Sequence, residues 1–169
     1  MGQSADATIA WGVQLYDKEG EIDYDDDAAV AAHEALGEKL EEFEDEDLAR
    51  ALGFAEEFPG WPEHLRGLPL AQRDTDEYRA HQAKIDAYRA RYDAAVPLET
   101  DSFGTYDYGG TALVFRRTRA NVDWSIMSVD PATLAPPTEE ERAKLNAVLD
   151  HLGFTGDREP KLLLFAMYG

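Results

Sequence analysis

Three features that often identify a protein class are missing from this sequence. Cysteine is absent from all 169 residues, which excludes disulfide bonds and thiolate metal ligands. No apolar run approaches about 18 residues, and no basic segment followed by an apolar core opens the chain, so the sequence predicts neither a membrane span nor a secretion signal. We expect a cytoplasmic protein, and the length and the 44% hydrophobic content suit one globular domain.

Recognisable catalytic motifs are also missing. No serine lies in a Gly-x-Ser-x-Gly sequence, the motif that places a nucleophile on a sharp turn. The histidines show no ligand pair at helical spacing; they are His33, His64, His81 and His151. We therefore assign no catalytic residue, no metal ligand and no cofactor, and the sequence favours a non-enzymatic protein over an enzyme.

Basic residues are scarce, and the deficit is concentrated in one segment. The chain has 16 Lys and Arg against 35 Asp and Glu, a net charge of −19. Residues 17–57 hold 3 of the basic and 17 of the acidic residues, a net charge of −14. A field of this sign repels nucleic-acid phosphates and anionic membranes, and it attracts basic protein surfaces or cations. We expect no direct nucleic-acid partner and no membrane partner.

Hydrophobic patterning predicts strands at both ends of the chain and a hairpin between them. Residues 8–16 alternate apolar and polar side chains, which is typical of a half-buried strand. Residues 98–106 and 111–116 flank an Asp-Tyr-Gly-Gly turn and predict the hairpin. The apolar run 161–169 follows a proline and predicts a strand that is buried on both faces in the middle of the sheet.

Four helices are expected from apolar spacing and capping residues. They cover residues 27–44, 47–52, 74–95 and 139–152. Thr138 and Glu141 form a capping box for the last helix, and Gly153 stops it. The order of elements predicts one α+β domain, residues 1–169, with a mixed or mainly antiparallel sheet of about four strands and helices on one face. Within it, an acidic helical insert spans residues around 17–57. We expect the longest and the last helix to cover the sheet.

A calcium-loop pattern lies at the start of the first expected helix. Asp23, Asp25 and Asp27 fall at positions 1, 3 and 5 of an EF-hand loop, and Glu34 falls at position 12. Position 6, where the sharp turn needs Gly, is Ala28, and the segment before the loop reads as a strand rather than an entering helix. The aspartates equally suit a helix N-terminus, whose dipole favours negative charge. We favour this second interpretation, with calcium binding as the alternative.

The acidic side of the first helix is the candidate partner-binding site. Its carboxylates lie opposite the apolar stripe: Glu34, Glu38, Glu41, Glu42 and Asp45. At about 1.5 Å per residue this row is about 16 Å long, close to five base-pair steps of about 3.4 Å. The row could stand in for the phosphates of DNA, or it could be a solvated helix face. Gly37 costs up to about 1 kcal/mol relative to Ala, which makes a helix break there an alternative.

A basic cluster and a tyrosine seam are the two other groups of side chains whose surroundings can be predicted. Residues 116–119, Arg-Arg-Thr-Arg, form the one basic cluster, and we favour internal pairing or solvation for it over contact with a partner. Three tyrosines lie in the apolar seam of the longest helix, where packing against the sheet is expected. They are Tyr78, Tyr88 and Tyr92.

Four segments carry a resemblance to other sequences. They are the opening Met1–Gly12, the Tyr106–Tyr108 turn with its apolar return strand, residues 129–134, and a closing helix, Gly, Pro-Lys and apolar strand that ends in Tyr168-Gly169. In these segments, about half the chain, the sequence resembles a family of small uncharacterised proteins encoded by bacteriophages and prophages. The resemblance implies a phage or mobile-element setting. It implies no activity and no functional residues, and the acidic middle helix is not part of the shared pattern.

These observations lead to two main functional hypotheses. The first is a non-enzymatic acidic interaction protein, a phage-encoded DNA-mimic-like inhibitor that binds a basic surface on a host protein, such as a nucleic-acid-binding one. The alternative is a structural or dimerising protein, for example a homodimer, whose acidity only gives solubility. A small enzyme and a calcium-binding protein are weaker alternatives.

Overall fold

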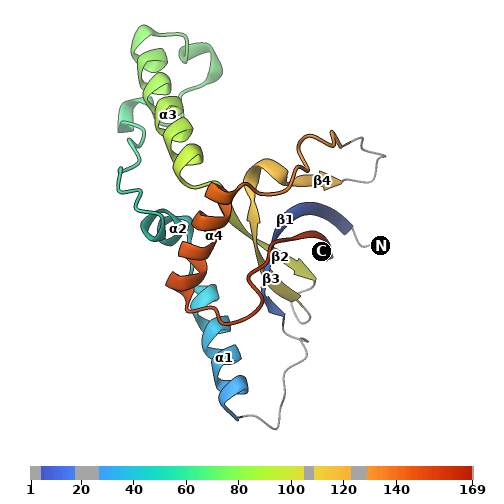
Figure 1. Cartoon of the computed structure of the whole chain (residues 1–169). Helices are drawn as coiled ribbons and strands as arrows, with labels where there is room; N and C mark the ends of the chain where they lie inside the picture. Colours follow the sequence, from blue (N-terminus) through green and yellow to red (C-terminus); the bar gives the residue numbers. More distant parts are fainter. Residues whose placement is uncertain (1–4, 18–26, 105–108, 123–128, 169) are drawn as a thin grey trace.

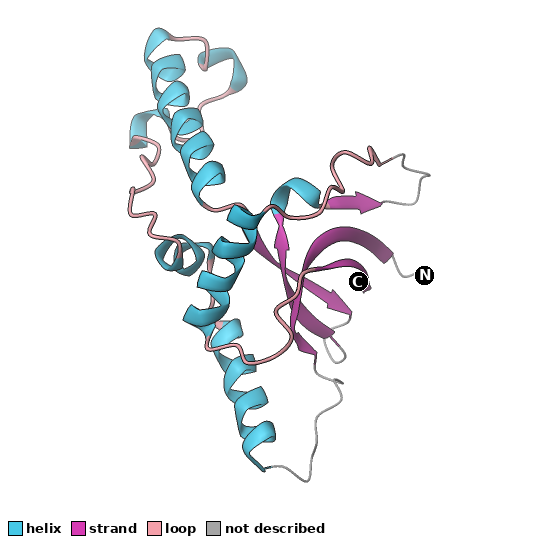
Figure 2. Cartoon of the chain, in the orientation of Figure 1, coloured by secondary structure: helices cyan, strands magenta, loops and turns pink. Residues whose placement is uncertain are grey.

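The sheet is organised around β1 (Ala5–Asp17) in the computed structural model, which describes residues 5–17, 27–104, 109–122 and 129–168. One edge of β1 pairs antiparallel with β5 (Lys161–Tyr168), and the other pairs antiparallel with β3 (Gly109–Phe115) and β4 (Ala120–Val122). β2 (Leu98–Gly104) pairs with β3 and meets β5 in a single parallel bridge. The sheet therefore curls back on itself, and the prediction of a mainly antiparallel sheet is confirmed (Figure 2).

A buried threonine bridges the gap between β3 and β4. The chain forms a short 3-10 helix at Arg116–Thr118, which interrupts the backbone pairing with β1. The hydroxyl of Thr118 accepts a hydrogen bond from the backbone N–H of Trp11 at 2.9 Å and donates one to the carbonyl of Phe115 at 2.9 Å. A side chain thus replaces the missing strand partner of β1 at this point.

Three helices, α1 (Asp27–Glu41), α2 (Asp45–Ala51) and α4 (Glu139–Leu152), pack on one face of the sheet. The main core lies between them and the sheet. It includes Leu15 and Phe115 from the strands, and Leu48, Leu145 and Leu149 from the helices. A smaller cluster around Ala10, Ala112 and Val114 fills the other, inner face of the curl. The prediction of helices on one face is confirmed.

The ends of α4 follow the predicted capping pattern. The hydroxyl of Thr138 accepts from the N–H of Glu141 at 3.3 Å, and the Glu141 carboxylate accepts from the N–H of Thr138 at 2.7 Å. Gly153 ends the helix in the left-handed conformation at φ 72°. Both signals are local in the sequence, which is why they could be predicted from it.

The prediction that the longest helix covers the sheet is wrong. α3 (Asp76–Ala95) projects away from the sheet, and only its last turn, through Tyr92 and Ala95, reaches the main core (Figure 1). The tyrosine seam packs instead on the chain that leads into α3. Trp61 stacks on Tyr78 with ring centroids 4.7 Å apart, and Phe54 meets Tyr88 edge-to-face at 5.7 Å. An apolar seam predicts that something covers it, but it does not say which segment.

The final strand is also less buried than its sequence predicts. β5 lies in the sheet as expected, but Leu162 is 45% exposed and Leu164 is 75% exposed. Leu163 and Phe165, which point to the opposite face, pack against the inner cluster. The prediction of burial on both faces is wrong because the main core under the helices does not extend to Leu162 and Leu164.

The first helix runs unbroken through Gly37. A Cβ atom at this position would lie 2.9 Å from the ring of Tyr16, so the glycine allows the tyrosine to lie flat against α1. The same ring stacks on His33 with centroids 4.3 Å apart. The close approach of a ring, rather than a helix break, accounts for the glycine.

Candidate acidic interface

Three of the five predicted site residues form one exposed face of α1. Glu34, Glu38 and Glu41 follow each other at steps of four and three residues, which places them on the same side of the helix, and all three are exposed. We call this set the α1 acidic face. The opposite side of α1 carries Leu36 and Leu40, which pack against the main core. The sheet therefore holds α1 with its carboxylates turned toward solvent.

The carboxylates of the α1 acidic face have no internal counter-ions among the described residues. None of the ion pairs formed by those residues includes a side chain between Asp27 and Glu44. The one lysine on α1, Lys39, donates instead to the backbone carbonyl of His151 at 2.7 Å, at the C-terminal end of α4. Its charge is thus used to stabilise a neighbouring helix end.

The other two predicted site residues do not continue the row. α1 ends at Glu41, so Glu42 is exposed in the turn, and Asp45 is the first residue of α2. At the start of α2, the Asp47 carboxylate accepts a hydrogen bond from the backbone N–H of Glu44 at 3.1 Å. Asp45 has a partner, because its carboxylate lies 3.3 Å from the guanidinium of Arg116. The prediction of a straight 16 Å row of carboxylates on a single helix is therefore wrong. The side chains of residues 44–47 cap a new helix, and this ends the row at Glu41.

Asp23 and Asp25, the first two aspartates of the calcium-loop pattern, lie outside the described residues. Asp27, the third aspartate of the pattern, begins α1, as the capping interpretation expects of a first-turn carboxylate. Within the described part of the chain, no group of three or more His, Asp or Glu side chains is placed to hold a metal ion.

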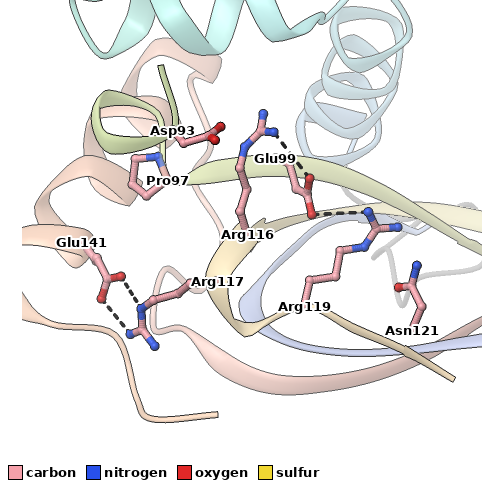
Figure 3. Close-up of a pocket in the computed structure, with 8 residues that line it drawn as sticks. All are labelled: Asp93, Pro97, Glu99, Arg116, Arg117, Arg119, Asn121 and Glu141. Atoms are coloured by element: carbon pink, nitrogen blue, oxygen red, sulfur yellow. Dashed lines mark hydrogen bonds and ion pairs between the residues drawn. The ribbon is translucent and has the colours of Figure 1, made fainter. Parts of the chain in front are cut away.

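The predicted basic cluster lines a groove of about 750 Å³ beside the sheet, shown in Figure 3. Each of its arginines is already paired with carboxylates of this chain. Arg117 contacts Glu141 at 2.6 Å, and Arg119 contacts Glu99 at 3.4 Å. Arg116 lies 3.8 Å from Glu99 in addition to its contact with Asp45. Internal pairing and solvation were both favoured for this cluster, and the structure shows internal pairing. An anionic ligand would have to displace these carboxylates to bind the arginines.

Two carboxyl groups near this arginine groove have shifted pKa values. Hydrogen bonding to the Arg117 guanidinium lowers the pKa of Glu141 from its ordinary 4.5 to about 2, against the opposing effect of burial. Burial raises the pKa of Asp101, and the nearby Arg119 guanidinium opposes that rise. Arg119 Nε lies 2.9 Å from Asp101 Oδ2, and this ion pair is the source of the opposing effect. Neither carboxyl group belongs to the α1 acidic face.

Comparison with known proteins gives no family for this chain: no protein-family model matches it, and searches of curated proteins and of solved structures found no match. None of the described helices is both long enough and apolar enough to cross a membrane.

Sequence reasoning did not find the partners of the arginine cluster or the aromatic cluster beside α3. Arg116 and Asp45 are 71 residues apart, and Arg117 and Glu141 are 24 apart, so no local pattern links them. The Glu141 contact could have been anticipated only in part, because its position in the capping box marks it as a fixed carboxylate. The aromatic contacts depend on how residues 53–61 fold back onto α3.

Proposed function

We propose that the protein binds a basic surface of a nucleic-acid-binding protein through the α1 acidic face and competes with DNA for that surface. One observation carries the proposal. The carboxylates of the α1 acidic face have no cation of the chain within ion-pair distance among the described residues, whereas Glu56, Glu99 and Glu141 are each held by an arginine. An unpaired carboxylate can meet a partner's lysine or arginine without first breaking an internal ion pair.

The spacing of the α1 acidic face supports mimicry of nucleic acid. Glu34 and Glu41 are seven residues apart on a continuous helix, which corresponds to about 10 Å at about 1.5 Å per residue. Three base-pair steps of about 3.4 Å span the same length along DNA. Basic side chains arranged for phosphates over this length can therefore reach carboxylates of α1.

The charge of the surrounding segment supports fast association with such a partner. Residues 17–57 carry a net charge of −14 out of the −19 of the whole chain. A concentrated field of one sign steers an oppositely charged protein and raises the association rate, and added salt weakens the effect. We therefore expect binding that is rapid at low salt and falls steeply as salt rises.

The test compares two variants with the same net charge. In the acidic-face triple variant, Glu34→Gln, Glu38→Gln and Glu41→Gln remove three charges from α1. In the control triple variant, Glu63→Gln, Asp86→Asn and Asp93→Asn remove three exposed charges from other elements, so both variants change the net charge from −19 to −16. Each protein is immobilised, exposed to bacterial lysate at low salt and eluted first with duplex DNA and then with a salt gradient. Circular dichroism confirms that each variant is folded.

We expect the wild type and the control triple variant to retain a basic protein that duplex DNA releases, and the acidic-face triple variant to lose it. Equal retention by all three proteins would refute a role for α1. Retention that duplex DNA does not reverse would refute competition with nucleic acid. If none of the three proteins retains anything, the proposed function is refuted, and the alternative of a structural protein whose acidity only gives solubility is favoured.

A further inference from the structure

A groove of about 930 Å³ lies between α2, the 53–58 segment and α3, and aromatic rings line it. The rings belong to Phe54, Phe58, Tyr88 and Tyr92, and each of them contacts another ring of this set. Phe58 meets Tyr88 at 5.4 Å, and Phe54 meets Tyr92 at 5.4 Å, both edge-to-face. Phe58 is 52% exposed, although burying a phenylalanine ring is favourable. We call this the aromatic groove.

Carboxylates surround the aromatic groove. Four of its lining residues are acidic and two are basic: Asp45, Glu46, Glu56 and Glu57 against Arg50 and Arg89. Asp45 and Glu56 are paired with Arg116 and Arg91, and Arg50 is held by Asp47 at 2.6 Å. Among the described residues this leaves Glu46 and Glu57 without ion pairs, opposed by one unpaired lining cation, Arg89. Aromatic faces and unpaired carboxylates both favour a cationic ligand.

The chain already shows how a guanidinium fits this surface. Arg116 lies over the ring of Tyr92, 5.4 Å from its centroid, and its guanidinium is also 3.3 Å from the carboxylate of Asp45. A ring and a carboxylate that both line the aromatic groove thus hold one arginine of the chain. Phe58, whose ring is 52% exposed, and Glu57, which forms no ion pair with a described residue, are groups of the same two kinds in the same groove.

We propose that the aromatic groove binds an arginine side chain from an arginine-rich segment of the basic partner. The proposal rests on the function proposed above and adds to it the residue that the partner inserts. Arginine is favoured over lysine because its planar guanidinium stacks on a ring while its N–H groups reach a carboxylate. The α1 acidic face then supplies long-range attraction, and the aromatic groove supplies short-range contact that slows dissociation.

The probe is a fluorescein-labelled hexa-arginine peptide, with binding measured by fluorescence anisotropy as NaCl concentration rises. Phe58→Ala removes the ring, and Phe58→Leu keeps an apolar side chain but removes the aromatic face. Leu70→Ala is the matched control, because Leu70 is 81% exposed and lies outside the aromatic groove. We expect both Phe58 variants to weaken binding about twofold to fivefold, the range for a partly exposed cation–aromatic contact, and Leu70→Ala to bind like the wild type.

The outcomes separate this proposal from the proposed function. Normal binding by Phe58→Leu would overturn the cation–aromatic contact, and equal Phe58 dependence with a hexa-lysine probe would overturn the preference for arginine. If the acidic-face triple variant loses affinity and salt dependence while both Phe58 variants bind normally, the role of the α1 acidic face is supported and the role of the aromatic groove is refuted. If only the Phe58 variants weaken binding, the role of the aromatic groove is supported and the role of the α1 acidic face is refuted.

Discussion

The charge of Glu141 offers a quantitative test of how the arginine groove stabilises the fold. Its carboxylate contacts Arg117 at 2.6 Å and also caps α4 by accepting from the N–H of Thr138. Glu141→Gln removes the charge but leaves an oxygen that can still accept the capping hydrogen bond, because glutamine also serves in capping boxes. The substitution therefore removes the charge of the carboxylate and the hydrogen bond that its Oε1 accepts from Arg117 Nε, and it keeps the cap of α4.

The size of the effect follows from the pKa of Glu141. A fall in pKa from 4.5 to about 2 corresponds to at most about 3 kcal/mol of extra stability for the charged form. The Arg117 side chain is 38% exposed, so water screens part of this interaction. We expect Glu141→Gln to lower the free energy of unfolding by about 1 to 2 kcal/mol at pH 7.

The sign of the pH dependence is fixed by the direction of the shift. Because the pKa of Glu141 is lower in the folded state, the stabilisation is fully present above pH 4.5 and is lost as the pH falls toward 2. Urea unfolding of the wild type and of Glu141→Gln between pH 7 and pH 2, followed by circular dichroism, gives the difference directly. That difference should be constant down to about pH 5 and should then shrink toward zero.

The neighbouring Glu140 supplies the control. Its side chain is 81% exposed and lies in the same first turn of α4, 3.4 Å from Lys144, so Glu140→Gln removes a charge from a similar position without a strong partner. We expect it to change stability by less than about 1 kcal/mol. A Glu141→Gln effect no larger than that of Glu140→Gln, or one that persists unchanged at pH 2, would show that the Glu141–Arg117 contact does not stabilise the fold in this way.

Two further substitutions test the sheet. Thr118→Val removes the hydroxyl that accepts from the N–H of Trp11, and leaving that buried donor unpaired should cost about 1–3 kcal/mol of unfolding free energy. Thr118→Ser keeps the hydroxyl and should recover most of the loss, so an equal loss in both variants would assign the effect to packing. Leu164→Ser should change the unfolding free energy by less than about 0.5 kcal/mol because the side chain is 75% exposed. A cost of several kcal/mol in thermal or urea unfolding would mean that Leu164 is covered.

The parts of the fold that follow from local chemistry could be predicted from the sequence. The capping box of Thr138 and Glu141, the stop at Gly153 and the alternation along β1 each depend on a few neighbouring residues. The class of fold follows from the order of such elements. The exposure of Glu34, Glu38 and Glu41 likewise follows from the periodicity of α1.

The parts that depend on distant contacts could not be predicted. The apolar run at the C-terminus gives the same pattern whether one or both faces of β5 are covered, and the exposure of Leu164 depends on how far the helices reach across the sheet. The tyrosine seam of α3 predicts packing without naming Trp61 and Phe54 as partners. Asp45 looks like its acidic neighbours in sequence, and only the fold places it beside Arg116.

The proposed function requires the α1 acidic face to occupy a surface that otherwise binds DNA. Its most direct test is a competition between this protein and a labelled DNA duplex for one captured partner protein, followed by fluorescence anisotropy. We predict that the wild type displaces the duplex and that about tenfold more of the acidic-face triple variant is needed for the same displacement, because three exposed ion pairs contribute about 0.5 kcal/mol each. Failure of the wild type to displace the duplex, or equal displacement by the wild type and the acidic-face triple variant, would contradict it.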